Sequence, residues 1–189
     1  MGKLIVTEFV SLDGVMEAPG GELGYAHSGW VMPFVADAGQ QEYKLRETLD
    51  AAALLLGRVT YEGFAAAWPG REDPMGFAAK MNAMPKYVVS STLTDPEWNN
   101  TTVVGTDLAA AVADVKGRVD GDLLVAGSRT LVHGLLTSGL VDELRLMVFP
   151  LVLGSGMRWF PESPDPLPLA LVRTQAFASG VVVHEYARG

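Results

Sequence analysis

Short apolar runs that suit β-strands alternate with longer stretches that suit α-helices over most of the chain, and this alternation limits the fold more than any other feature. The first run, Leu4–Val10, is β-branched and aromatic and leads into an Asp-Gly turn signal. Further strands are expected at residues 52–56, 87–90, 102–104 and 123–126, and helices at 37–49, 59–67, 76–84, 107–115 and 130–137. Strands that alternate with helices predict a largely parallel sheet.

The C-terminal part of the chain is rich in strands instead. Leu144–Leu153 is strand-like, and Leu169–Phe177 and Val181–Tyr186 flank a short Ala-Ser-Gly segment that suits a hairpin turn. The expected class is an α/β, three-layer fold, in which helices flank a mostly parallel mixed sheet that ends in an antiparallel C-terminal hairpin. The chain has 189 residues and no visible linker or repeat, so residues 1–189 are expected to form one domain.

Composition excludes several kinds of chemistry and partner. The chain has no cysteine, which rules out disulfides, thiolate nucleophiles and cysteine-bound zinc. A net charge of -8 argues against nucleic acid, and the apolar runs are too short for a membrane span or a signal peptide. His27, His133 and His184 do not have the spacing of metal ligands. We therefore expect a cytoplasmic protein that acts on a small molecule without a metal.

An unusually long connection follows the first strand. Residues 15–33 show little periodicity and contain a Pro-Gly-Gly break, which predicts an active-site lid or binding loop, or alternatively a disordered surface loop. Asp13 lies where the strand ends, and Glu17 lies within the connection. Asp13 has two open interpretations, a turn residue or an acid that contacts the substrate.

Three strand-to-helix junctions carry residues that suit phosphate groups. They are Leu56–Thr60, Val89–Thr92 and Val125–Thr130, and the first and third combine glycine, arginine and a hydroxyl residue. Ligands of open α/β sheets lie outside the carboxyl ends of the strands, where helix N-termini present free N–H groups and a partial positive charge. One such junction is more often a turn and a helix cap. Three together predict an extended dianionic ligand, such as a dinucleotide with an extra phosphate.

At the first junction, Gly57–Glu62 reads Gly-Arg-Val-Thr-Tyr-Glu and resembles the Gly-Arg-x-Thr-aromatic-Glu motif of dihydrofolate reductases. The second junction is similar to their adenosine-side strand end. The third is similar to their glycine-rich pyrophosphate turn, with Ala126 and Ser128 in place of the usual glycines. The resemblance implies NADPH as the cofactor. The residues that it implies in cofactor binding are Gly57, Arg58, Thr60, Ser90, Ser91, Thr92, Gly127, Ser128, Arg129 and Thr130.

Other segments are more similar to the reductase domain of the bifunctional riboflavin-biosynthesis deaminase/reductase and to stand-alone proteins related to it. These segments are Ser11–Gly14, Gly139–Leu144 and Pro150–Gly156, and the resemblance covers nearly the whole chain. Two features depart from the bifunctional enzyme. Val125–Gly127 replaces a frequent Glu-Gly-Gly, and a chain without cysteine cannot hold the zinc of the deaminase. The resemblance implies a stand-alone reductase that forms a homodimer through its C-terminal strands.

The activity implied by the resemblance is hydride transfer from NADPH to a pterin- or pyrimidine-like ring. The enzymes that the chain resembles in this respect are dihydrofolate reductase and the 5-amino-6-(5-phosphoribosylamino)uracil reductase of riboflavin biosynthesis. The alternative is a non-catalytic nucleotide-binding or interaction protein that keeps the fold. Asp13 or ordered water is the expected proton source.

The substrate side is less clearly marked in the sequence. The first predicted helix offers Asp37, Glu42 and Glu47, and none matches the acid that pairs with the pterin in dihydrofolate reductases. Flat apolar ligands are commonly lined by aromatic side chains, and Trp30, Phe34, Tyr61 and Phe64 are candidates for one wall of such a cleft. The residues expected at the substrate are Glu17, Trp30 and Asp37.

Overall fold

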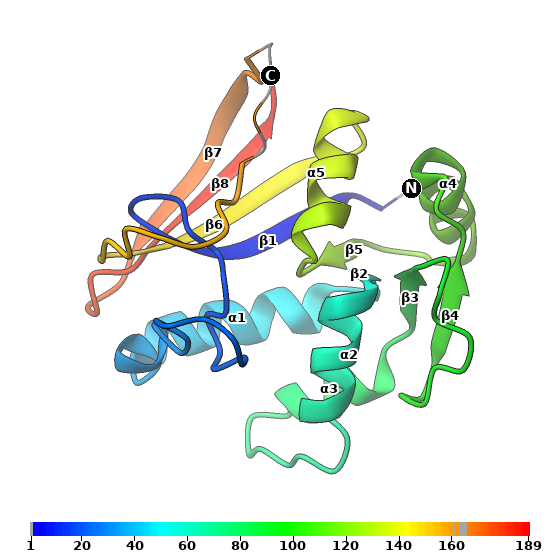
Figure 1. Cartoon of the computed structure of the whole chain (residues 1–189), viewed down its shortest axis with the longest axis horizontal. Helices are drawn as coiled ribbons and strands as arrows, with labels where there is room; N and C mark the ends of the chain where they lie inside the picture. Colours follow the sequence, from blue (N-terminus) through cyan, green and yellow to red (C-terminus); the bar gives the residue numbers. More distant parts are fainter. Residues whose placement is uncertain (1, 161, 163–165) are drawn as a thin grey trace. The chain divides into compact units, whose positions relative to one another are not determined.

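The computed structural model describes residues 2–160, 162 and 166–189. Figure 1 labels its helices and strands. The contacts within the chain group into two compact units. The first unit comprises Met1–Val6 and Leu45–Asp142, and the second comprises Thr7–Lys44 and Glu143–Gly189. Strand β1 and helix α1 each run from one unit into the other.

The first unit is a parallel sheet with helices between its strands. The strands hydrogen-bond in the order β4-β3-β2-β5-β1, and the pairs between them are parallel. The strands are β1 (Leu4–Ser11), β2 (Ala53–Gly57), β3 (Lys86–Val89), β4 (Thr101–Val104) and β5 (Leu123–Val125). The helices are α1 (Ala38–Asp50), α2 (Arg58–Ala67), α3 (Phe77–Ala83), α4 (Leu108–Arg118) and α5 (Arg129–Thr137). The predicted alternation of strands and helices is confirmed.

Burial explains why these short apolar runs become strands. The side chains of β2 and β5 are all buried, as expected for a parallel sheet that is covered on both faces. On one side, Ile5, Leu54 and Leu124 pack in a cluster with Tyr61 and Trp98. The Tyr61 hydroxyl also accepts a hydrogen bond from the backbone N–H of Trp98 at 3.1 Å. The core of this unit is therefore closed by aromatic residues from α2 and from the segment before β4.

The second unit contains the antiparallel strands. Its strand order is β1-β6-β8-β7, where β6 is Glu143–Phe149, β7 is Leu169–Ala176 and β8 is Val182–Arg188. Strand β8 pairs antiparallel with both β6 and β7, which confirms the predicted C-terminal hairpin. The expected strand over 144–153 is too long, because β6 ends at Phe149, just before a proline that has no N–H to donate to a sheet.

The core of the second unit is aromatic. The Phe149 ring makes edge-to-face contacts with the rings of Phe9, Trp30 and Phe34, at centroid distances of 5.3 to 5.5 Å. Met147, Val181 and Val183 join the same cluster. Such edge-to-face pairs add to the free energy gained by burying the rings.

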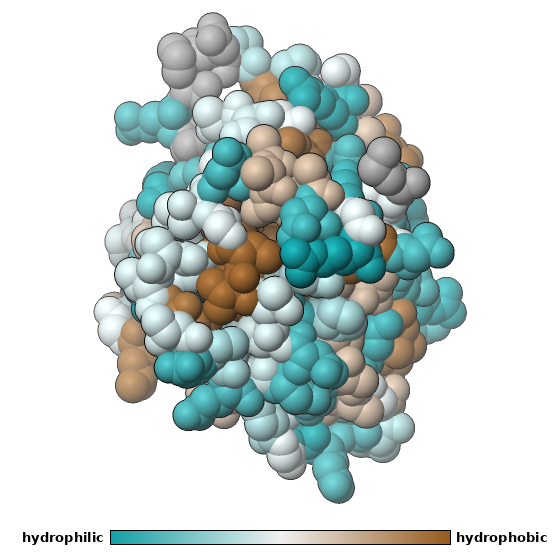
Figure 2. Space-filling view, turned by 90° about the vertical axis from the view of Figure 1, so that its right-hand side faces the viewer, coloured by the Kyte–Doolittle hydropathy of each residue, from teal (hydrophilic) through white to brown (hydrophobic). Residues whose placement is uncertain are grey.

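Within the described residues, the strands of both units make an eight-stranded mixed sheet that is mostly parallel. The predicted α/β class is thus confirmed. Figure 2 shows one face of the molecule, which is mainly hydrophilic and carries its hydrophobic side chains in separate patches. Among the described residues, no helix is both long and apolar enough to span a bilayer.

Candidate functional site

The three junctions predicted from the sequence lie at the carboxyl ends of neighbouring strands of the first unit. Strand β2 is hydrogen-bonded to β3 on one side and to β5 on the other, with Gly57 in register with Val89. The backbone N–H of Gly57 donates to the carbonyl oxygen of Gly127 at 3.3 Å. The structure therefore brings the junctions of β3, β2 and β5 to one edge of the sheet. The second is not a strand-to-helix junction as predicted, because a loop without a helix leads from β3 to β4.

Close approach of two backbones explains the glycine at the end of β2. A Cβ atom built on Gly57 would lie 2.2 Å from Oγ of Ser128, a distance that real side chains do not reach. Gly127 has a φ of 102°, which favours glycine, and the Gly127–Ser128 peptide bond is cis. The first and third junctions thus touch through residues whose small size is required.

The helices that begin at these two junctions lack side-chain caps. Helices α3 and α4 are capped by aspartates, since Asp73 accepts from the N–H groups of the first turn of α3 and Asp107 accepts from Ala110. In the described part of the chain, no side chain caps α2 at Gly57 or α5 at Ser128. Without a capping side chain, the positive end of the helix dipole favours an anion at both positions.

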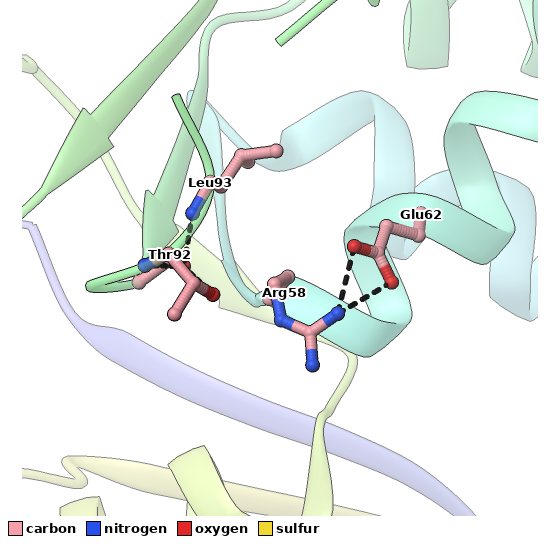
Figure 3. A network of polar contacts seen from close by, with 5 residues as sticks. Arg58, Glu62, Thr92 and Leu93 are labelled. Atoms are coloured by element: carbon pink, nitrogen blue, oxygen red, sulfur yellow. Dashed lines mark hydrogen bonds and ion pairs between the residues drawn. The ribbon is translucent and has the colours of Figure 1, made fainter. Parts of the chain in front are cut away.

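Arg58 is the first residue of α2, and its side chain is partly exposed. Nη1 of Arg58 donates to both carboxylate oxygens of Glu62, at 2.8 and 2.9 Å (Figure 3). The side chains of Arg58 and Glu62 are 44% and 48% exposed. Figure 3 also shows Thr92 of the second junction across from Arg58. The guanidinium is therefore held at the strand edge and remains open to solvent.

At the second junction, Ser90 has a structural role and its neighbours are exposed. The Ser90 hydroxyl oxygen accepts from the N–H groups of Thr92 at 3.1 Å and Leu93 at 3.0 Å, which fixes a tight turn after β3. The side chains of Ser91 and Thr92 face solvent. Of the three hydroxyl residues predicted here, Ser91 and Thr92 are the ones available to a ligand.

The other predicted cofactor residues lie in first helical turns. Thr60 is in the first turn of α2 and is half-buried, while Arg129 and Thr130 open α5. Arg129 is half-buried and Thr130 is exposed. The structure therefore brings together all the predicted cofactor residues at the carboxyl edge of the parallel strands.

In the second unit, Asp13 is fixed by hydrogen bonds. Its carboxylate accepts from the Ser11 hydroxyl at 2.6 Å, and from the backbone N–H groups of Leu153 at 3.1 Å and Gly154 at 2.9 Å. The hydrogen bond from Ser11, followed by that from Leu153, lowers the pKa of Asp13 to about 2. The carboxyl group is therefore ionised at neutral pH, where it accepts hydrogen bonds and has no proton to donate.

The long connection after β1 is held by the segment that follows β6. Glu17 accepts from the backbone N–H of Met157 at 2.8 Å, and the Tyr25 hydroxyl donates to the carbonyl oxygen of Ser155 at 2.6 Å. Backbone hydrogen bonds also join Leu12 to Leu151 and Met16 to Met157, two pairs of residues in those two segments. The connection is thus a hydrogen-bonded part of the second unit.

Trp30 and Asp37, the other residues predicted at the substrate, also make defined contacts in this unit. Nε1 of Trp30 donates to the carbonyl oxygen of Glu17 at 2.8 Å, and the side chain is only 6% exposed. Asp37 accepts from the N–H of Gln40 at 3.0 Å, so it is the predicted N-cap of α1, and it also accepts from Ser179 at 2.8 Å. The Gln40 bond, followed by the Ser179 bond, holds the pKa of Asp37 below its usual value.

The predicted aromatic wall is not one cluster. Tyr61 and Phe64 pack in the hydrophobic core of the first unit, whereas Trp30 and Phe34 pack around Phe149 in the second. The expectation of a single wall was wrong because spacing along the chain does not show which layer a side chain joins. The core role favoured for Phe64 fits its packing.

Two ionisable residues were missed as candidates. Glu8 is 9% exposed and, among the described residues, its Oε1 atom has no hydrogen-bond partner. Burial raises the pKa of Glu8 to about 8, against the opposing effect of the nearby Lys44 charge. Lys44 Nζ donates to the Thr7 hydroxyl at 3.0 Å and lies 5.1 Å from the Phe9 ring centroid. A charged residue inside an otherwise apolar strand was the signal in the sequence.

Comparisons with known proteins show the family of the chain. The family model for the RibD C-terminal domain matches residues 2–183. The uncharacterized protein YyaP of Bacillus subtilis is 27% identical over 183 residues, covering 95% of this chain and 92% of that protein.

Two solved structures show the same fold. A putative riboflavin biosynthesis protein from Shewanella sp. PV-4 superposes with a TM-score of 0.75 at 22% identity, covering 99% of both chains. Dihydrofolate reductase from Enterococcus faecalis, complexed with NADP(H), superposes with a TM-score of 0.63 at 17% identity, covering 100% of this chain and 97% of the other.

Proposed function

Since the chain belongs to the RibD C-terminal domain family, we propose that it is an NADPH-dependent reductase that transfers a hydride to a pterin- or pyrimidine-like ring. The observation that carries the proposal is the row of three junctions, two of which begin helices without side-chain caps. When bound, the nicotinamide supplies the hydride from its C4 carbon. The residues of this chain bind the cofactor and orient it.

We assign the phosphate groups to the junctions by their donors. The 2′-phosphate is dianionic and suits the Arg58 guanidinium together with the exposed hydroxyl groups of Ser91 and Thr92. The pyrophosphate suits the N-terminus of α5, where Gly127 permits close approach of the backbone and Arg129 adds a positive charge.

For the substrate side we propose positioning roles. Asp13 and Glu17 hold the segment after β6 against the connection after β1, and Asp37 fixes the start of α1 on the β7–β8 turn. The ionised Asp13 carboxylate leaves ordered water as the better proton source. This hydrogen-bonded framework would then shape the substrate pocket, and ordered water would supply the proton.

A homodimer through the C-terminal strands is also proposed. Strand β7 lies at the edge of the sheet, and its Leu171 and Val172 side chains are 58% and 61% exposed. An exposed apolar edge strand is a template for pairing with a second chain. Sedimentation equilibrium of the wild type and of a Leu171→Lys variant checks this, since the variant is expected to dissociate.

The experiment that tests the cofactor assignment compares Arg58→Ala with the wild type in titrations of NADPH and NADH. Charge-assisted hydrogen bonds to phosphate contribute about 1.5–3 kcal/mol, so NADPH should bind roughly 10- to 100-fold more weakly and NADH nearly unchanged. Arg118→Ala is a matched control, because Arg118 forms a similar exposed pair with Asp114 on α4. Equal losses for both cofactors would remove Arg58 from the 2′-phosphate site.

A turnover assay distinguishes the proposed reductase from the alternative, a non-catalytic nucleotide-binding protein. Oxidation of NADPH is followed in the presence of dihydropterins, ribosylaminopyrimidines and simple carbonyl compounds. Reduction of one class supports the reductase and identifies its substrate. Tight NADPH binding with no turnover on any of them supports the alternative.

A further inference from the structure

The Arg58–Glu62 pair is arranged so that one edge of the guanidinium stays available. Both hydrogen bonds to Glu62 come from Nη1. Within the described part of the chain, Nη2 and Nε of Arg58 have no hydrogen-bond partner. Figure 3 shows the Glu62 carboxylate on one side of the Arg58 guanidinium, while the other terminal nitrogen, Nη2, points away from that carboxylate. A planar donor edge of this kind suits a phosphate.

The order of the two charges works against the helix that carries them. Arg58 is the first residue of α2, where a positive charge meets the positive end of the helix dipole. An acid four residues after a base is also the weaker orientation of such a pair. The pair Asp114–Arg118 on α4 has the favourable order, with arginine in the last turn. The stability of α2 therefore does not explain why Arg58 and Glu62 occupy these two positions.

We propose that Glu62 determines cofactor specificity by setting how strongly Arg58 attracts a phosphate dianion. This inference rests on the proposed function. The carboxylate neutralises the guanidinium and lies on its flank, so it repels an incoming dianion while it leaves the outer edge open. Glu62 thereby limits the affinity of the site for the 2′-phosphate and has little effect on the rest of the dinucleotide.

The test is a calorimetric titration of wild type and Glu62→Gln with adenosine 2′,5′-bisphosphate and with 5′-AMP. The amide keeps the size of the side chain and one acceptor oxygen while it removes the charge. Removing a unit charge beside a partly exposed dianion should strengthen binding of the bisphosphate about fivefold and leave 5′-AMP within about twofold. The gain should shrink in high salt, because exposed charges are screened.

Asp114→Asn serves as the matched control, since it removes the acid from the similar pair on α4 and should change neither titration. Thermal unfolding of both variants checks that α2 and α4 are intact. If the wild type prefers the bisphosphate but Glu62→Gln binds it equally or more weakly, the inference is overturned and the proposed function stands. If the wild type binds the two nucleotides equally, the proposed function is overturned, and the inference with it.

Discussion

Lys86 should be one of the most sensitive positions for stability, because its charged end is enclosed. The residue is fully buried at the start of β3. Its Nζ donates to the carbonyl oxygens of Asn82 at 2.9 Å, Met84 at 2.9 Å and Asn99 at 3.1 Å. It also lies 4.2 Å from the ring centroid of Trp98. The ammonium group therefore joins the end of α3 to the segment before β4.

The cost of Lys86→Met can be estimated from these contacts. Methionine retains the apolar stem, but three carbonyl oxygens lose their donor at about 1 kcal/mol each, and the cation–π contact adds about 1 kcal/mol. Part of this loss is offset because an uncharged side chain no longer has to be desolvated. That desolvation is the cause that lowers the pKa of Lys86 to about 8. The net loss is expected to be about 3 kcal/mol, or roughly 6–12 °C in Tm.

Urea unfolding followed by tryptophan fluorescence measures this change. Lys80→Met is a matched control, because Lys80 Nζ makes one hydrogen bond, to the carbonyl oxygen of Leu49 at 2.9 Å, near the surface. The control should lose less than about 1 kcal/mol. Similar small losses in both variants would refute the argument that the three carbonyl bonds of Lys86 stabilise the first unit.

Three further outcomes are expected. Gly57→Ala should lower both Tm and NADPH affinity because its Cβ would collide with Ser128, whereas Gly63→Ala, which meets no atom within 4 Å on the same helix, should raise stability by up to about 1 kcal/mol. Asp13→Asn should lower Tm in thermal unfolding, and a variant with unchanged Tm but reduced turnover would restore its catalytic interpretation. The pKa of Glu8 is raised on folding, so its contribution is full below pH about 4.5 and is lost as pH rises through about 8. Glu8→Gln should remove that pH dependence and be the more stable protein above pH 8 in denaturant titrations.

Run length and the alternation of apolar runs with helical stretches predicted the helices and strands of the first unit. The apolar run at residues 123–126, for instance, is shorter than a typical helix, which favours a buried strand, and β5 occupies 123–125. Element ends were less predictable. The apolar run of β6 continues to Leu153, yet the strand ends at Phe149. Apolar character alone does not show where the backbone pairing of a strand ends.

Site residues were predictable where the reason for them is local. The glycines and hydroxyl residues after β2 and β5 follow from strand-to-helix geometry within a few residues of sequence, whereas β3 leads through a loop to β4. The role of Asp13 was left open because its partners, Leu153 and Gly154, are 140 and 141 residues away along the chain. Nothing in an Asp-Gly turn indicates that its carboxylate will join two distant backbone amides.

The pattern of helix capping explains how an acidic chain can bind an anionic cofactor. With a net charge of -8, the molecule as a whole repels a dinucleotide phosphate, so attraction has to be local. Aspartates accept hydrogen bonds from first-turn N–H groups of α3 and α4, and their negative charge opposes the positive end of each helix dipole. Helices α2 and α5 begin instead at Gly57 and Ser128 without a side-chain cap, and each has an arginine as its first residue. Positive potential is therefore concentrated at two neighbouring strand ends, and a ligand with two separated phosphate groups gains more there than one with a single group.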